Sequence, residues 1–260
     1  MGQLTSNVTE SAMDLKSRIK RMPIVGQAFQ WLSRTTRPLR IRLAQFNSST
    51  YWDSRYANGG NSGNGSFGEL ARFKAGIIND FVAENQIDSV IEFGCGDGNQ
   101  LALSKYPHYI GIDVSPTALQ RCRHLFRGDA TKKFLRYGEP DANPLRADLV
   151  LSLDVIYHLV EDDIYEKYMQ DVFEAATRFV IVYSDDEEAP RDILHVRHRK
   201  FSNWIGQNQP DWHLISHIPN KFPWDEGTER GSFADFWIYE KVTNPLREGA
   251  RYAMQSGSER

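Results

Sequence analysis

The sequence predicts an α/β protein built on a doubly wound, mostly parallel β-sheet that ends in a C-terminal antiparallel hairpin. Between residues 67 and 183, short runs rich in β-branched and aromatic residues alternate with amphipathic stretches of helical period. The first run leads directly into a glycine-rich turn, which is where open parallel sheets place their ligand crevice. The last third of the chain holds two β-like segments with little helix between them, which indicates the hairpin.

Periodicity and capping signals justify the elements of the first half. Leu70 and Phe73 share one face of a helix, and Ser66 stands where its N-terminal cap belongs. The pair Ser115-Pro116 marks another helix start, because serine caps helices and proline is favoured at the first helical position. The expected elements are a helix over 67–84, the strand Ser89–Phe93, a helix over 99–105, a strand over 109–113 and a helix over 116–126.

The second half continues the alternation and then loses its helices. Strands that alternate with helices form parallel βαβ units, whereas two successive strands pair as a hairpin at a sheet edge. The expected elements are strands over 133–137 and 148–153, a helix over 163–177, a strand over 179–183 and hairpin strands over 213–218 and 233–242.

Composition indicates a globular protein without disulfides. The chain has 260 residues, 40% of them hydrophobic and 25% charged, which suits one large domain with appended segments. Its two cysteines, Cys95 and Cys122, exclude a disulfide framework and a zinc cluster and favour a cytoplasmic location. No run approaches the roughly 20 apolar residues of a membrane span. The formal net charge of −3 argues against nucleic acid as a partner.

Four segments are expected along the chain. They are a basic, partly amphipathic N-terminal arm (1–50), a Gly/Ser-rich lid (51–68), the main domain (69–242) and a flexible tail (243–260). The arm contains eight Lys and Arg residues but only two acidic residues. Basic helices carrying Trp and Phe can lie on an anionic bilayer surface, and the alternative is a solvated arm that packs on the main domain.

The glycine turn and two acids around it point to a specific kind of ligand. Residues 92–101 read "EFGCGDGNQL", which gives G-x-G-x-G and places the third glycine one residue earlier than in the dinucleotide fingerprint. Glu92 precedes the turn, where a carboxylate suits an ammonium or hydroxyl and disfavours a pyrophosphate. Asp113 closes the second strand, from which a carboxylate can accept hydrogen bonds from ribose hydroxyls. A nicotinamide-dependent dehydrogenase is therefore disfavoured.

Three motifs carry a resemblance to a known family. "VIEFGCGDG", "YIGIDVS" and "ADLVLSLDVIYHL" resemble the first, second and fourth-strand motifs of class I S-adenosylmethionine-dependent methyltransferases. The resemblance covers about residues 67–183 and implies a Rossmann-like fold, methyltransferase activity and S-adenosyl-L-methionine as cofactor.

The resemblance also implies roles for the residues in these motifs. Gly94, Cys95 and Gly96 would pass along the methionine part of the cofactor, and Glu92 would orient the turn and the amino group. The remaining contacts would come from Asp113 to the ribose, Val114 to the adenine and Asp154 to the sulfonium or amino end. For the adenine contact after the third strand, the "GDA" signature at 128–130 and the segment 137–139 are both candidates, and we favour Tyr137.

The acceptor is expected to meet the cofactor just after the fourth strand. Methyl transfer is an in-line displacement, and a hydroxyl acceptor benefits from a base within hydrogen-bond reach. Asp154, Tyr157 and His158 are the catalytic candidates, with His158 as the preferred base because its unperturbed pKa lies near neutrality. The alternative is that His158 caps or packs the following turn. Asp185 and Asp186 could complete a Mg²⁺ site, but acidic runs are more often solvated, and no metal is expected.

A basic segment after the fifth strand is the candidate acceptor wall. In "HVRHRKFSNWI", residues 195–205, Arg197, His198 and Arg199 could bind an anionic or sugar-bearing acceptor. The alternative is a basic surface helix.

A narrower resemblance suggests the acceptor. "YWDSRYANGGNSGNGSFGELARFKAGIIND" together with "EFGCGDGNQL" resembles bacterial methyltransferases of cell-surface polysaccharide synthesis. This implies O-methylation of a sugar or glycan in the cytoplasm, with peripheral contact at the inner face of the membrane. The alternatives are N-methylation of an amino sugar or small amine, and a non-catalytic cofactor-binding scaffold.

The stretch 58–70, "NGGNSGNGSFGEL", has two open interpretations. It is not a P-loop, because it lacks G-K-[ST] and no strand precedes it. A plain linker is one interpretation. We favour a mobile lid in which Tyr51, Trp52 and Tyr56 cover the ligand, Tyr51 contacts the cofactor, and the glycines let backbone approach it.

Overall fold

The computed structural model describes residues 46–139, 145–189, 193–228 and 230–242. The predicted tail and the predicted arm up to residue 45 lie outside the described residues. Helix α3 (Ser48–Ala57) contains the predicted boundary between arm and lid at residue 50. No helix among the described residues combines the length and the apolar character needed to cross a membrane.

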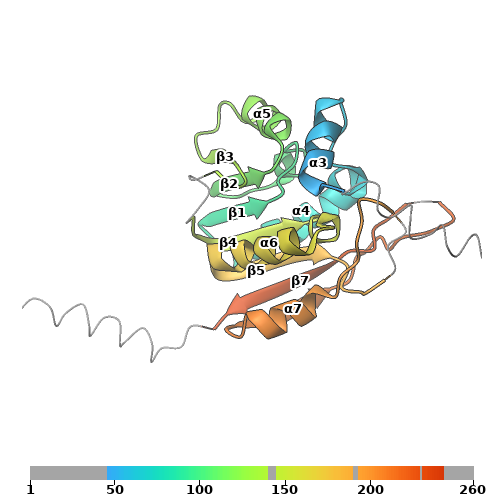
Figure 1. The fold of residues 1–260 in the computed structure, drawn as a ribbon. Helices are drawn as coiled ribbons and strands as arrows, with labels where there is room; N and C mark the ends of the chain where they lie inside the picture. Colours follow the sequence, from blue (N-terminus) through green and yellow to red (C-terminus); the bar gives the residue numbers. More distant parts are fainter. Residues whose placement is uncertain (1–45, 140–144, 190–192, 229, 243–260) are drawn as a thin grey trace, which may run out of the picture. The chain divides into compact units, whose positions relative to one another are not determined.

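A single seven-stranded sheet organises the described part of the chain (Figure 1). Its strand order is β3-β2-β1-β4-β5-β7-β6, with β1 to β5 parallel and β7 antiparallel to both of its neighbours. The strands are β1 (Ser89–Phe93), β2 (His108–Asp113), β3 (Lys132–Arg136), β4 (Ala147–Leu153), β5 (Ala176–Ser184), β6 (Trp212–Ile218) and β7 (Asp235–Lys241). The predicted fold class is confirmed, including the C-terminal antiparallel hairpin.

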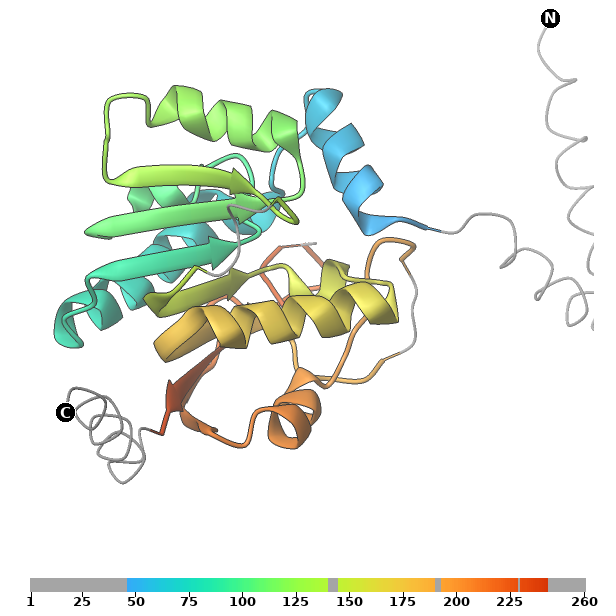
Figure 2. The same ribbon diagram turned by 60° about the vertical axis from the view of Figure 1, so that its left-hand side comes forward.

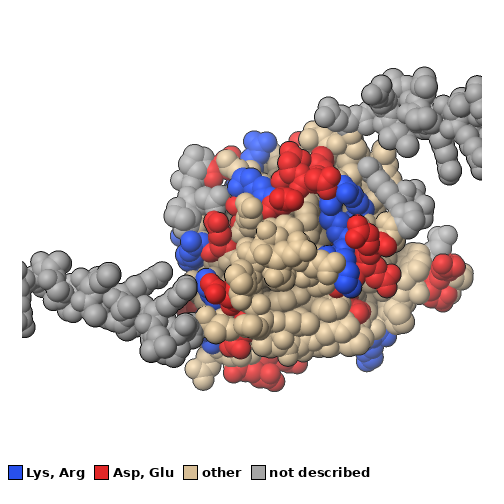
Figure 3. Space-filling model, turned by 60° about the horizontal axis from the view of Figure 1, so that its bottom comes forward, with Lys and Arg blue, Asp and Glu red and all other residues tan. Residues whose placement is uncertain are grey.

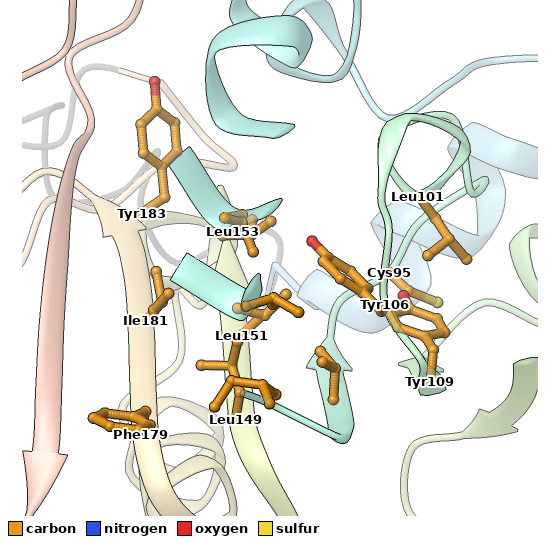
Figure 4. Packing of buried hydrophobic residues seen from close by; sticks show 14 of the residues in the cluster. Cys95, Leu101, Tyr106, Tyr109, Leu149, Leu151, Leu153, Phe179, Ile181 and Tyr183 are labelled. Atoms are coloured by element: carbon orange, nitrogen blue, oxygen red, sulfur yellow. The ribbon is translucent and has the colours of Figure 1, made fainter. Parts of the chain in front are cut away.

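Helices cover both faces of this sheet and bury two apolar clusters. Besides α3, they are α4 (Gly68–Glu84), α5 (Pro116–Leu125), α6 (Asp162–Ala175) and α7 (Phe201–Asn208), with short 3₁₀ turns η1 (Asn64–Ser66), η2 (Leu101–Leu103) and η4 (Ile156–His158). Alternate residues of β4 serve the two faces: Leu149, Leu151 and Leu153 pack with α4 and α5 (Figure 4), whereas Val150 packs with α6 and α7. Strands buried on both faces are typical of parallel sheets.

The start of α5 follows the sequence signal, but the start of α4 does not. Ser115 Oγ accepts a hydrogen bond from the Ala118 amide at 3.2 Å, and Pro116 occupies the first turn of α5. At α4 the N-terminal cap is Phe67, which provides no side-chain hydrogen bond, so the predicted Ser66 cap is wrong. Ser66 belongs to η1 instead, where its carbonyl accepts a hydrogen bond from Asn99 Nδ2.

The predicted helix over 99–105 is also wrong, because only the 3₁₀ turn η2 forms there. Pro107 disfavours helical backbone at the residue before it, and β2 already begins at His108. The side chain of Gln100 is buried, and its Nε2 donates to the Ala71 carbonyl of α4 at 3.1 Å. The segment therefore ties the turn after β1 to α4.

The C-terminal hairpin brings a long loop to the carboxyl ends of the parallel strands. Because β7 runs antiparallel to β5, its first residue, Asp235, pairs with Ser184 at the end of β5. The described parts of the loop that precedes β7, residues 219–228 and 230–234, therefore lead to the same end of the sheet as the turns after β1, β2 and β4. Helix α3 lies beside α5 near this edge (Figure 2).

Candidate active site

The turn after β1 requires glycine because other chain segments approach it closely. Gly94 and Gly96 have φ values of 82° and 56°, in the left-handed region that favours glycine. A Cβ on Gly94 would lie 2.3 Å from Val155 Cγ2, and one on Gly96 would lie 2.3 Å from Ser62 Oγ. The two glycines therefore leave room for Val155, in the turn after β4, and for Ser62 of the Gly/Ser-rich segment.

Two buried carboxylates support this turn. Asp113 Oδ2 accepts from the Gly96 amide at 2.9 Å and Oδ1 accepts from the Ser115 amide at 2.8 Å, which joins the end of β2 to the glycine turn. Glu92 Oε2 accepts from the Tyr109 hydroxyl at 2.6 Å. Loss of hydration raises the pKa of Asp113 to about 6 and that of Glu92 to about 7, because burial disfavours the charged form.

Asp154 lies at the end of β4 in a strained conformation held by three contacts. Its φ is 59°, and its amide donates to the Tyr183 carbonyl at 2.9 Å. Oδ1 accepts from the Tyr157 hydroxyl at 2.8 Å, and Oδ2 lies 2.5 Å from Lys74 Nζ. Asp154 is therefore positioned by a helix, α4, that precedes the sheet in the chain.

A cavity of about 340 Å³ opens between these groups, within the range of small-molecule sites. Nine predicted site residues line it: Glu92, Gly94, Cys95, Gly96, Asp113, Val114, Tyr137, Asp154 and His158. The prediction missed other lining residues, among them Ser62, Lys74, Gln100, Arg136, Leu153, Val155 and Tyr168. Of these, Lys74 had a signal in the sequence, because it stands four residues from both Leu70 and Ile78 on the apolar face of α4.

The Gly/Ser-rich segment is folded against the glycine turn. Ser62 Oγ donates to Asp97 Oδ1 at 2.8 Å, and the Asp97 amide donates to Ser62 Oγ at 3.1 Å. Arg121 of α5 donates to the Tyr56 and Gly60 carbonyls at 2.7 and 2.6 Å. Two of the three predicted lid aromatics, Trp52 and Tyr56, line the cavity.

Tyr51 lies in an aromatic cluster, which we define as Tyr51, Trp52, His158 and His195. The Tyr51 ring stacks on His195 with centroids 4.8 Å apart, and His195 stacks on His158 at 5.6 Å. Trp52 meets His158 edge to face at 4.8 Å. Tyr51 is not among the cavity-lining residues, so its contact with the cofactor stays a prediction, whereas His158 joins the cluster to the cavity.

His158 is half-buried and neutral, and its tautomer follows from one contact. Its Nδ1 lies 3.0 Å from the His195 carbonyl oxygen, which can only accept, so Nδ1 carries the proton and Nε2 the lone pair. Burial lowers the pKa of His158 to about 4. Its neighbour Tyr157 is buried and bonded to Asp154, and burial raises the pKa of that phenol well above its usual range.

The predicted acceptor-binding residues have protein partners of their own. Arg197 and Arg199 both pair with Asp162, at 2.9 and 2.7 Å, and both donate to the Val160 carbonyl. His198 Nδ1 lies 2.7 Å from Asp185 Oδ2. None of the three lines the cavity, and helix α7 begins at Phe201, after the basic run.

The acids considered for a metal are likewise engaged. Asp185 pairs with His198, and Asp186 accepts from the Ser202 amide and hydroxyl at 2.9 and 2.6 Å, at the start of α7. Within the described ranges, no three His, Cys, Asp or Glu side chains converge as metal ligands.

Comparison with known proteins adds the enzyme class. Residues 91–180 match a family model described as a methyltransferase domain. The chain contains a methyltransferase domain. This domain spans β1 to β5 and includes the glycine turn, Asp113, Asp154 and His158. No curated protein matches the sequence.

Three solved structures share the fold. The N-methyltransferase NodS from Bradyrhizobium japonicum WM9, in complex with S-adenosylhomocysteine, aligns with a TM-score of 0.60 and 12% identity over 76% of this chain and 100% of its own. Magnesium protoporphyrin IX methyltransferase ChlM from Synechocystis PCC 6803, with bound S-adenosylhomocysteine, aligns with a TM-score of 0.53 and 13% identity. The alignment covers 75% of this chain and 100% of ChlM. The methyltransferase domain of bacterial CtHen1-C aligns with a TM-score of 0.53 and 18% identity. The alignment covers 67% of this chain and 100% of that domain.

The methyltransferase domain has a cavity whose residues fit the expected cofactor. Gln100 Oε1 is buried without a hydrogen-bond partner among the described residues, so a ligand that brings a donor would satisfy it. Gly94 and Gly96 leave the backbone open to close approach, and Asp113 offers lone pairs at a strand end. The predicted class of S-adenosylmethionine-dependent methyltransferase, and its cofactor, are confirmed.

Proposed function

We propose that the chain transfers a methyl group from S-adenosylmethionine to a hydroxyl of a sugar or glycan. The observation that carries this proposal is the neutral His158, which lines the cavity beside Asp154 with its lone pair on Nε2. A neutral imidazole nitrogen can accept the proton of an acceptor hydroxyl.

The residues that would hold the cofactor lie on three successive turns. S-adenosylmethionine supplies an electrophilic methyl group on a sulfonium. Asp113 would accept hydrogen bonds from the ribose hydroxyls through the lone pairs that Gly96 and Ser115 leave free. Val114 and Tyr137 would flank the adenine, and the glycine turn would pass along the methionine part.

The low pKa of His158 matches a late proton transfer. As the acceptor oxygen forms its bond to carbon it becomes positively charged, so its O–H becomes a strong acid. A base of pKa about 4 is then sufficient to receive the proton at Nε2. The same low pKa keeps Nε2 of His158 unprotonated at neutral pH, so that it can align the hydroxyl beforehand.

The aromatic cluster supports a ring-shaped acceptor. Trp52 and His158 both line the cavity and meet edge to face, with Tyr51 and His195 continuing outward from them. Aromatic faces pack well against the C–H faces of sugar rings, because both are apolar and rigid while their rims carry polar groups. This is consistent with a role in cell-surface polysaccharide synthesis.

N-methylation of an amino sugar or small amine is the second candidate. Glu92, Asp113 and Asp154 line the cavity and would attract an ammonium as well as hydroxyl groups. The fold is shared with NodS, which is described as an N-methyltransferase.

The cellular setting is part of the proposal. The eight basic and two acidic residues of 1–50 suit contact with anionic lipid at the cytoplasmic membrane face, where a lipid-linked glycan would be met. The described face in Figure 3 carries basic and acidic side chains side by side rather than a continuous basic surface. The fold itself is shared with a putative RNA methyltransferase from Pyrococcus horikoshii, so the expected absence of nucleic acid rests on charge.

A labelled substrate screen tests the proposal. The full chain is incubated with methyl-¹³C S-adenosylmethionine and a panel of nucleotide sugars, lipid-linked glycans, amino sugars and RNA, and NMR locates the new methyl group. The proposal expects a methyl signal on a sugar oxygen. A methyl group on nitrogen or on RNA would overturn the O-methylation of a sugar.

A further inference from the structure

Lys74 is a buried ammonium on the cavity wall for which the motifs assign no role. It lies in the middle of α4, and its side chain is 1% exposed. Lysine is almost never fully buried unless its charge is paired. Its position between Leu70 and Ile78 would suit an apolar residue, so the charge must be needed for something other than packing.

The contacts of Lys74 leave donors for a ligand. An ammonium has three N–H groups. Among the described residues, its hydrogen bonds reach one acceptor, Asp154 Oδ2, and Nζ also lies 5.1 Å above the ring centre of Tyr183. A buried charged donor without a partner is costly, and Lys74 lines the cavity, so a bound acceptor there would be favourable.

The charges around the cavity make this ammonium important for an anionic ligand group. Glu92, Asp113 and Asp154 line the same cavity and would repel a carboxylate. Arg136, the other cationic lining residue that the structure describes, is exposed on β3, on the far side of β2 from β1. A buried cation beside Asp154 is therefore the group that allows a carboxylate to enter here.

A matching acceptor lies nearby. Gln100 Oε1 is buried without a partner among the described residues, while Gln100 Nε2 is fixed on the Ala71 carbonyl. Ala71 and Lys74 are three residues apart on one face of α4. A cationic donor and a neutral acceptor thus both line the cavity, which is the complement of an α-amino acid.

We propose that Lys74 binds the carboxylate of the amino-acid end of the cofactor, and that Gln100 Oε1 accepts from its ammonium. This assignment rests on the proposed function only in that the ligand is S-adenosylmethionine or its product. It makes Lys74 and Gln100 the residues that distinguish the complete cofactor from shortened nucleosides.

Ligand truncation tests the assignment. Calorimetry on the full chain compares S-adenosylhomocysteine, its decarboxylated analogue and 5′-methylthioadenosine. Wild type should bind the decarboxylated analogue about 10- to 100-fold more weakly than S-adenosylhomocysteine, the range expected for one hydrogen bond to a charged group. Lys74→Met should remove this preference and leave 5′-methylthioadenosine unaffected, and Gln100→Leu should weaken both ligands that carry the ammonium.

Two controls separate a direct contact from an indirect one. Lys132→Met removes a comparable lysine, paired with Asp129 at 2.7 Å outside the cavity, and should change no affinity. Lys74→Met leaves the Asp154 carboxylate without its ion-pair partner. The double variant Lys74→Met/Asp154→Asn removes both charges and therefore controls for this effect. If the double variant regains wild-type preference for the carboxylate, Lys74 acts only by neutralising Asp154, and the proposal is overturned.

The wild-type series is informative even if both variants fail to fold. Equal affinity for S-adenosylhomocysteine and its decarboxylated analogue would overturn the role of Lys74. Wild type that binds none of the three ligands would instead contradict the proposed function.

Discussion

Ser62 Oγ lies 2.8 Å from Asp97 Oδ1, and this hydrogen bond joins the Gly/Ser-rich segment to the glycine turn after β1. The contact is reciprocal, because the Asp97 amide donates back to Ser62 Oγ at 3.1 Å. The segment therefore reaches the cavity through specific polar contacts. Whether it moves is a separate prediction.

The lid interpretation predicts a change in hydrogen exchange. Adding S-adenosylhomocysteine should protect backbone amides of residues 51–68, because a ligand beneath Trp52 and Tyr56 would hold the segment closed. Ser62→Ala should raise exchange of this segment in the free protein and reduce the protection on binding. The control is β6 at the opposite sheet edge, where exchange should not respond. Unchanged protection over 51–68 would return the segment to the status of linker.

Much of this site follows from short-range sequence signals. The strand Ser89–Phe93 and the glycine turn could be predicted, because a buried strand bounded by glycines has few other conformations. Asp113 and Asp154 follow from being the residues at strand ends. The helix over 99–105 was wrong because Pro107 and the early start of β2 override the local helical pattern.

Tertiary contacts determine the remainder. The pairing of Lys74 with Asp154 joins residues 80 positions apart, and nothing local in the sequence gives the partner of a lysine on a helix. Likewise, the sharing of Asp162 by Arg197 and Arg199 depends on how the segment after β5 folds back on α6. Charge and residue type indicated a binding surface there, whereas the structure provides internal partners.

The base role of His158 predicts an activity loss without a loss of cofactor binding. His158→Ala should lower kcat by about 100-fold or more, the usual contribution of a general base, and leave the Kd for S-adenosylhomocysteine within a few-fold. The matched control is His217→Ala, a histidine on β6 that pairs with Asp235 away from the cavity. Comparable kcat values for the two variants would mean that His158 only packs the turn.

The pKa of His158 also predicts how its ring titrates. Because burial lowers this pKa to about 4, Nε2 keeps its lone pair at neutral pH and loses it only as the pH falls through about 4. The His158 ring should therefore show no titration near 6.5, the usual pKa of histidine. The cavity carboxyls Glu92 and Asp113 have pKa values of about 7 and about 6 and would also affect kcat, so the measurement is an NMR titration of the His158 ring between pH 5 and 8. A midpoint near 6.5 would contradict the neutral histidine.

Glu92 predicts a pH dependence of stability. Its folded pKa, about 7, is raised above the usual value by burial, so the carboxyl stabilises the folded state most when protonated, and this contribution is lost as the pH rises through 7. Glu92→Gln should raise the free energy of unfolding at pH 8 by up to about 3 kcal/mol, and its advantage should shrink towards pH 5. Urea unfolding of both proteins measures this. A difference independent of pH would contradict the burial argument.

The basic segment allows a choice between acceptor binding and packing. Arg199→Ala should lower stability mainly through lost contacts with the Val160 carbonyl and the Tyr165 ring, because the ion pair with the mostly exposed Asp162 contributes about 1 kcal/mol or less. If the guanidinium also binds the acceptor, KM for that acceptor should rise with Arg199→Ala but not with Asp162→Asn, which removes the same ion pair. Equal KM values in the two variants would assign Arg199 to packing alone.

The central claim, a methyltransferase cofactor site built on β1 and β2, is tested most directly by calorimetric titration of the full chain with S-adenosylhomocysteine and with NAD. We predict that S-adenosylhomocysteine binds and NAD does not, and that Asp113→Ala abolishes the binding by removing the ribose contacts. Binding of NAD in place of S-adenosylhomocysteine, or unchanged affinity in Asp113→Ala, would contradict the account.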